Sequence, residues 1–212
     1  VDLDKFANDE KKMLRVEKMP SRLSMEDRVT HCAVSEKLVT TYRSTNKPIV
    51  WLWGAMGDVI TTMADSEKEK DDEPAERFGP GGCMKIVRHG IVLPNGLVMR
   101  YPGLREGGDG YSYLGGRFSK ERARCYGGSL TENISQALAR LVVVEQMLMI
   151  YGKYGLRPIT STHDELVYVV PDAKAEKTLE LVTQEMRTTP EWAAGLPLNA
   201  SGGIGQSYGE AK

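Results

Sequence analysis

Apolar residues recur at helical spacing through the first third of the chain. Between Met25 and Tyr42 they follow the period of one helix face, which predicts a helix there. Pro48 interrupts this pattern, and the apolar residues after it predict a second helix that continues past Ile60. Residues 1–64 are therefore expected to be mostly helical. Trp51 and Trp53 cannot both face one core on that second helix.

Shorter apolar runs between residues 83 and 101 predict strands. The runs 84–87 and 91–93 precede Pro94-Asn95-Gly96, and the run 97–101 follows it. Asn-Gly between two such runs is a strong signal for a β-hairpin. The segment before these strands, 66–77, is nearly all charged and is expected to be an exposed loop. The glycine-rich segment 102–118 indicates an irregular loop or a further short strand.

A long helix is predicted to begin at Ser129, which has capping-box spacing to Glu132, and to end at Gly152 or Gly155. Two β-prone runs, 158–162 and 166–170, then flank a polar triplet. This pattern predicts a second hairpin with that triplet, His163-Asp164-Glu165, at its bend. A further helix is expected over 173–187.

Composition narrows the class of protein. The 212 residues are 41% apolar and 27% charged, so the chain has enough apolar residues for a core and wholesale disorder is excluded. No apolar run approaches the roughly 18 residues of a membrane helix, and the first residues lack the layout of a signal peptide. Three distant cysteines without metal-ligand spacing favour a reducing compartment. We therefore expect a cytoplasmic protein that does not associate with a membrane. The net charge of −1 neither indicates nor rules out nucleic-acid binding.

Two groups of polar residues are candidates for chemistry. Adjacent carboxylates, Asp164 and Glu165, repel each other in a tight turn unless a divalent cation such as Mg²⁺ binds there. The alternative is an ordinary polar turn. Asn133 and Gln136 share one helix face, with Arg140 four residues beyond Gln136. Such donors suit the minor-groove acceptors of paired bases, and the alternative is a solvated helix face.

These residues carry a resemblance to a known family. Three motifs in order resemble the C-terminal palm of family A DNA polymerases, closer to the bacteriophage enzymes than to the bacterial repair enzyme: Tyr126-Gly127-Gly128, Asn133-x-x-Gln136-Ala137-x-Ala139-Arg140 and His163-Asp164-Glu165-Leu166-Val167. Five flanking segments resemble the fingers, the palm hairpin and the C-terminus of these enzymes: Val39-x-x-Tyr42-Arg43, Ile49-Val50-x-Leu52-Trp53, Leu93-Pro94-Asn95-Gly96, Trp192-Ala193-x-Gly195-Leu196-Pro197-Leu198 and a final glycine–tyrosine stretch.

The resemblance implies an α+β fold with an antiparallel palm sheet and long flanking helices. Residues 1–82 would form a helical, fingers-like segment with a charged loop, and residues 83–212 a palm-like segment. The implied activity adds deoxynucleotides to a primer by phosphoryl transfer at two Mg²⁺ ions, with primer–template DNA and deoxynucleoside triphosphates as substrates.

The resemblance also assigns roles to single residues. Asp164 would bind metal and, with Glu165, would be catalytic. His163 would contact the primer end, and Gln136, Asn133 and Arg140 would contact the duplex.

The sequence departs from the family pattern in several places. Leu141 stands where many relatives carry an acidic residue, and Thr162 replaces an apolar one. The family's other metal-binding aspartate motif and its nucleotide-binding fingers helix have no counterpart in this sequence. We therefore expect one chain of a split polymerase, completed by a second polymerase chain.

Two alternatives to this reading stay open. One is a non-catalytic remnant that binds DNA or a replication partner. The other is a metal phosphoesterase that uses Asp164, Glu165 and the histidines, although His31, His89 and His163 have no ligand spacing.

Overall fold

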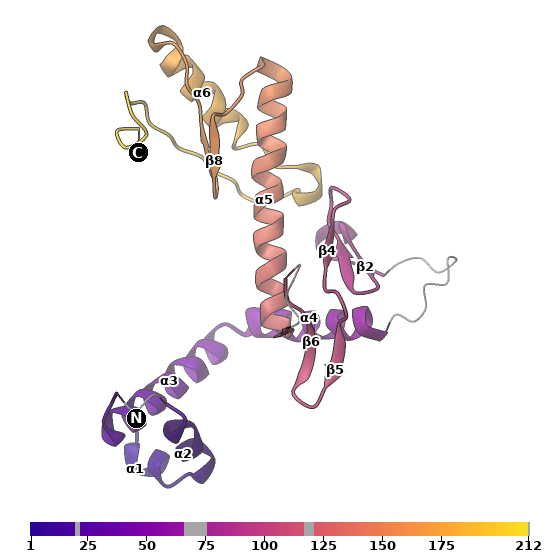
Figure 1. Cartoon of the computed structure of the whole chain (residues 1–212). Helices are drawn as coiled ribbons and strands as arrows, with labels where there is room; N and C mark the ends of the chain where they lie inside the picture. The colour runs from indigo at the N-terminus through magenta and orange to yellow at the C-terminus, as the bar shows by residue number, and fades with distance from the viewer. Residues whose placement is uncertain (20–21, 66–75, 117–120, 212) are drawn as a thin grey trace. The chain divides into compact units, whose positions relative to one another are not determined.

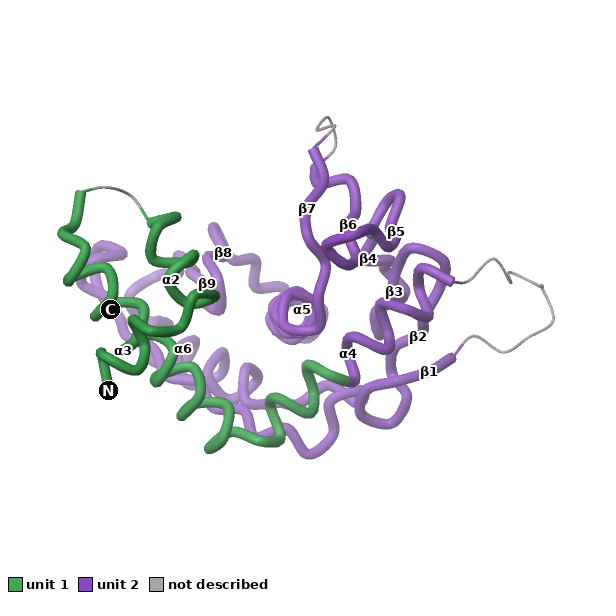
Figure 2. Tube along the Cα trace, turned by 90° about the horizontal axis from the view of Figure 1, so that it is seen from below, with its two compact units in different colours: residues 1–54 green, residues 55–212 purple. Residues whose placement is uncertain are grey.

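A computed structural model describes residues 1–19, 22–65, 76–116 and 121–211 (Figure 1). The chain divides into two compact units, Val1–Gly54 and Ala55–Lys212 (Figure 2). This division comes earlier than the domain boundary expected after residue 82, and the fingers-like and palm-like assignments stay predictions. Helices combine with antiparallel strands, which confirms the α+β class. Of the predicted charged loop, residues 66–75 lie outside the described part of the chain.

The first unit is helical, as predicted. It contains three complete helices and the start of a fourth: α1 (Leu3–Ala7), α2 (Glu10–Glu17), α3 (Met25–Thr45) and α4 (Lys47–Asp65). Asp2, Asp9 and Ser24 each accept a hydrogen bond from the backbone N–H three residues later, so a side chain caps each of the first three helices. Among the described residues of this unit, three buried apolar side chains form a core cluster: Phe6, Val16 and Ala33.

The second unit carries the strands, which form three separate antiparallel sheets among the described residues. The first sheet has the order β1-β2-β3-β4: Arg77–Phe78, Met84–Val87, Gly90–Val92 and Val98–Arg100. The second has the order β5-β6-β7: Arg105–Gly107, Gly110–Leu114 and Arg122–Arg124. The third is the hairpin of β8 and β9: Thr160–Thr162 and Glu165–Val167. A short 3-10 turn, η1 (Pro80–Gly82), precedes β2.

The predicted Asn-Gly hairpin is confirmed. Strands β3 and β4 pair in the register Val92 opposite Val98, and Gly96 takes a left-handed φ of 84° between them. The side chain of Asn95 accepts a hydrogen bond from the N–H of Leu97 at 3.1 Å, which closes the turn locally.

Helix α5 (Gly127–Tyr154) and the second half of α4 enclose the main core with the first two sheets. The buried residues of this cluster come from α4, the strands, the segments after them and α5: Met56, Val59, Ile60, Met63, Met84, Ile86, Ile91, Leu93, Tyr101, Leu104, Cys125, Leu130, Ile134 and Leu141. By length and composition alone α5 could span a membrane. Three of its buried side chains, Leu130, Ile134 and Leu141, belong to this shared core.

The start of α5 corrects one detail of the sequence analysis. The helix begins at Gly127, two residues before the predicted start, with extended Tyr126 as its N-cap. The hydroxyl of Ser129 accepts the N–H of Tyr126 at 3.0 Å and donates to its carbonyl at 2.8 Å. Ser129 therefore takes the position that Glu or Gln usually holds in a capping box, and the predicted box with Glu132 is wrong. The predicted end is confirmed, because Gly155 caps the helix with a φ of 67°.

The C-terminal part of the second unit packs onto α5. It contains η2 (Asp172–Lys174), α6 (Ala175–Glu185) and η3 (Glu191–Ala193), followed by an irregular tail. The buried side chain of Gln146 on α5 donates to the carbonyls of Met186 and Thr188, at 2.7 and 3.0 Å. The indole N–H of Trp192 donates to Glu145 on the same helix at 2.9 Å. These contacts hold α6 and η3 against the helix that carries the candidate DNA-contacting residues.

Candidate functional site

The polar triplet lies at the tip of a tight hairpin, as the sequence predicted. Thr162 pairs with Glu165, so His163 and Asp164 alone form the turn. His163 has a left-handed φ of 51°, which is uncommon for a residue with a β-carbon. Both turn residues are exposed, whereas Glu165 is half-buried as the first residue of β9. The turn therefore exposes Asp164 to solvent at the end of the short, hydrogen-bonded β8–β9 hairpin.

The two carboxylates have different surroundings. Within the described residues, Asp164 makes no hydrogen bond or ion pair. The carboxylate of Glu165 accepts a hydrogen bond from the hydroxyl of Tyr208, in the C-terminal tail. Mg²⁺ is commonly bound by one or two carboxylates, with waters and substrate phosphates in its other positions. An exposed aspartate beside an anchored glutamate fits that ligand set, although no three His, Cys, Asp or Glu side chains gather into a metal site in the described part of the chain.

Asn133 and Gln136 point to different surroundings on α5. Gln136 is exposed, and its side-chain amide donates to Glu132, one turn earlier, at 3.3 Å. The amide of Asn133 instead donates to the hydroxyl of Tyr101 at 3.0 Å. Tyr101 is 2% exposed, and burial raises the pKa of its phenol to about 12. Gln136 is thus available to a ligand, while Asn133 already has a structural partner.

Arg140 connects α5 to the hairpin. Its guanidinium donates to the hydroxyl of Ser161 at 2.8 Å and to the carbonyl of His163 at 3.4 Å. Strand β8 lies beside α5 at this point (Figure 1). The structure therefore brings Arg140 together with the His163-Asp164 turn, whereas Gln136 lies one helical turn away on the same helix.

Three residues with a direct structural link to this site were missed by the sequence analysis. They are Tyr101, Ser161 and Tyr208, each joined to a candidate residue by a side-chain hydrogen bond. For Tyr208 a signal existed, because the glycine–tyrosine ending was already part of the resemblance. Ser161 and Tyr101 belong to no motif, and their partners are 21 and 32 residues away in the sequence.

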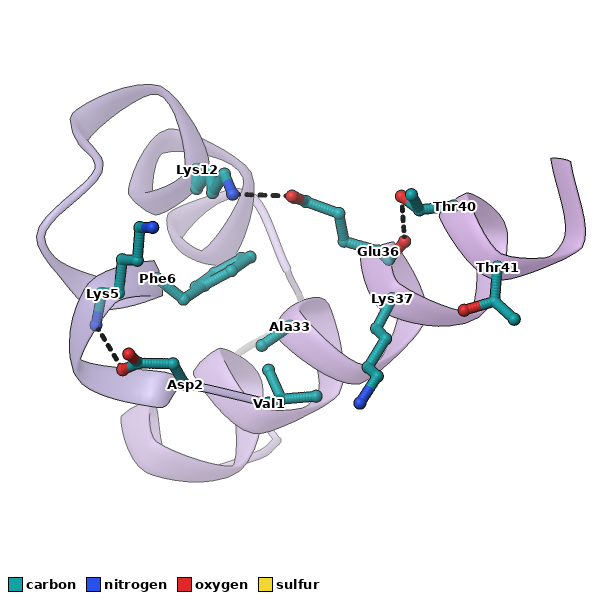
Figure 3. A pocket seen from close by; sticks show the side chains of 10 residues that line it. All are labelled: Val1, Asp2, Lys5, Phe6, Lys12, Ala33, Glu36, Lys37, Thr40 and Thr41. Atoms are coloured by element: carbon teal, nitrogen blue, oxygen red, sulfur yellow. Dashed lines mark hydrogen bonds and ion pairs between the residues drawn. The ribbon is translucent and has the colours of Figure 1, made fainter. Parts of the chain in front are cut away.

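The first unit contains a separate hollow of about 260 Å³ between α1, α2 and α3 (Figure 3). Two of its charged side chains, Lys12 and Glu36, already form an ion pair at 2.6 Å. None of the candidate site residues lines it. We assign the hollow no role.

The chain is related to a phage DNA polymerase over most of its length. It is 32% identical over 183 residues to the DNA polymerase of Bacillus phage SP02, a match that covers 81% of this chain. The chain spans only 27% of that relative. No protein-family model matches the chain, and no solved structure matches it.

Proposed function

We propose that this chain is the C-terminal palm, with part of the fingers, of a phage-type family A DNA polymerase. In this proposal it helps to add deoxynucleotides to the 3′ end of a primer paired with a template. The hairpin is the observation that carries the proposal, because it exposes Asp164 at a two-residue turn attached to the helix of Gln136. The relationship to a phage DNA polymerase supports the same reading.

Each residue of the site has a distinct task in the proposal. Asp164 holds Mg²⁺, which when bound supplies the positive charge that phosphoryl transfer needs. Glu165, anchored by Tyr208, adds a second negative charge next to Asp164. His163 is exposed beside Asp164 and contacts the primer end. Gln136 donates to the minor groove of the primer–template duplex.

The proposal also needs a second metal-binding aspartate and a nucleotide-binding helix. Neither motif occurs in the 212 residues. A second polypeptide, or residues joined to this sequence in a longer chain, would supply them. The first unit has apolar surface suited to such a contact, since Trp51 is 73% exposed and Leu38 is 65% exposed. An interface that completes a domain in this way would bury on the order of 2,000 Å² or more.

Primer extension with Mg²⁺ tests the assignment of Asp164. The assay uses the chain together with the polypeptide that carries the missing motifs, since the chain alone is expected to be inactive. Asp164→Ala should abolish extension and leave duplex affinity nearly unchanged, because the carboxylate binds metal and not DNA. Asp172→Ala is a matched control, as Asp172 is also an exposed aspartate, at the start of η2.

Three outcomes would count against parts of the proposal. Near-normal extension by Asp164→Ala would make Asp164 a turn residue only. Strong extension by the wild-type chain alone would remove the need for a second polypeptide. Duplex binding without extension, even with the missing motifs supplied, would favour a non-catalytic DNA-binding remnant.

A further inference from the structure

The side chain of Arg140 is directed at the hairpin. It reaches two acceptors there, the hydroxyl of Ser161 in β8 at 2.8 Å and the carbonyl oxygen of His163 in the turn at 3.4 Å. Both bonds come from one nitrogen, Nη1, which carries two N–H groups, so a single side chain links strand β8 to the turn and restricts the turn more than one bond would. Within the described residues Arg140 makes no ion pair with a carboxylate.

The accepting carbonyl belongs to the peptide group that joins His163 to Asp164. Because a peptide group is planar, a donor that fixes its oxygen also fixes the direction in which the chain enters Asp164. His163 needs support of this kind, since its φ of 51° lies in a region that residues with a β-carbon seldom occupy. The contact of Arg140 therefore acts on the conformation of the turn at the residue before Asp164.

We propose that Arg140 is a positioning residue that holds Asp164 in place for metal binding, and that it does not serve as a DNA ligand. This inference rests on the proposed function of Asp164. Gln136 lies four residues before Arg140, about 6 Å along the same helix. One rigid helix would then set both the contact with the duplex and the orientation of the metal-binding aspartate.

Hydrogen exchange of the 212-residue chain tests the first step without DNA or activity. Arg140→Ala and Ser161→Ala should speed amide exchange in the β8–β9 hairpin about 2- to 12-fold, the effect of losing one hydrogen bond. The N–H of Ile159 is a suitable reporter, because it bonds to the carbonyl of Val167 at the open end of the hairpin. In the Arg140→Ala/Ser161→Ala double variant, the hairpin amides should exchange no faster than in Arg140→Ala alone, because the bond between the two side chains is already lost there. Lys153→Ala, on the same helix but bonded to Glu185, is the control.

Mn²⁺ titration followed by NMR tests positioning against a merely structural role. In the wild-type chain, Mn²⁺ should broaden the amide signals of residues 163–166, and failure to do so would count against the proposed function itself. In Arg140→Ala, broadening should require several-fold more Mn²⁺. Arg140→Lys should recover part of the effect, since one ammonium group can replace one of the two contacts.

Duplex affinity measured against salt concentration separates the two roles of an arginine. A positioning residue leaves the slope of log K against log salt unchanged, whereas loss of a phosphate contact reduces it by about 1. Unchanged hairpin exchange in Arg140→Ala would overturn the inference. So would a reduced salt slope, or faster exchange combined with unchanged Mn²⁺ broadening.

Discussion

Asn133 and Gln136 lie one helical turn apart, yet their loss should have opposite consequences. Asn133→Ala removes the donor that lies 3.0 Å from the hydroxyl of Tyr101, a group that is 2% exposed. Depriving a buried polar group of its partner costs about 1–3 kcal/mol of unfolding free energy. Gln136→Ala removes an exposed bond to Glu132 and should change stability by no more than about 0.5 kcal/mol. In a domain of this size, about 1 kcal/mol corresponds to a shift of roughly 2–4 °C in Tm.

Urea unfolding followed by tryptophan fluorescence measures this difference. The signal should come from the second unit, so Trp51 and Trp53 are first replaced by Phe. Trp192 then reports on α5, because its indole N–H bonds to Glu145. Tyr101→Phe completes a double-mutant cycle with Asn133→Ala, and the expected coupling is about 0.5–1.5 kcal/mol.

The result that would refute this reasoning is equal stability of Asn133→Ala and Gln136→Ala. Zero coupling between Asn133 and Tyr101 would refute it as well. Either outcome would return Asn133 to the solvated helix face that the sequence left open. Both residues would then be equally available to contact DNA.

Three further predictions address the site, the support of α5 and the buried thiol. Gln136→Ala should slow primer extension most when a mismatch lies near the primer end, by about 2- to 12-fold for one lost hydrogen bond. Unchanged mismatch sensitivity would show that Gln136 does not contact the duplex. Gln146→Leu leaves the carbonyls of Met186 and Thr188 without their donor. Urea unfolding should show an unfolding free energy lower by about 1–3 kcal/mol. A variant as stable as the wild type would show that water replaces the amide. Burial raises the pKa of Cys125 to about 11, so iodoacetamide should label the half-buried Cys32 and Cys83 first, as mass spectrometry can show. Because the unfolded thiol ionises from the lower value of 9.0, the contribution of Cys125 to stability should be lost as the pH rises from 9.0 toward 11.

Local patterns in the sequence identified the elements that carry the site. The hairpin at His163-Asp164-Glu165 follows from two β-prone runs around a polar bend, and the long helix follows from its apolar period and its C-terminal glycine. Both signals depend on neighbouring residues only. By contrast, two strands of the second sheet, β5 and β6, lie where the glycine-rich segment 102–118 indicated a loop or one short strand, because Gly107 and Gly110 lower β-propensity on either side of their turn.

The spacing of residues along the sequence does not predict the side-chain contacts of the site. Asn133 and Gln136 differ by about 60° around the helix axis, which places them on one face but does not say which one meets the core. Only the position of Tyr101 decides that Asn133 turns inward. Arg140 and Ser161 are 21 residues apart, and Glu165 and Tyr208 are 43 apart, so their pairing depends on the tertiary fold.

The two-residue turn at His163 and Asp164 has a consequence for how the gene can vary. Side chains alternate between faces along a strand, so one added or deleted codon within the segment for residues 160–167 would exchange the faces of β8 or β9. A base substitution at Thr162 leaves that alternation intact. In a library of in-frame insertions and deletions, this stretch should therefore tolerate replacements but not changes of length.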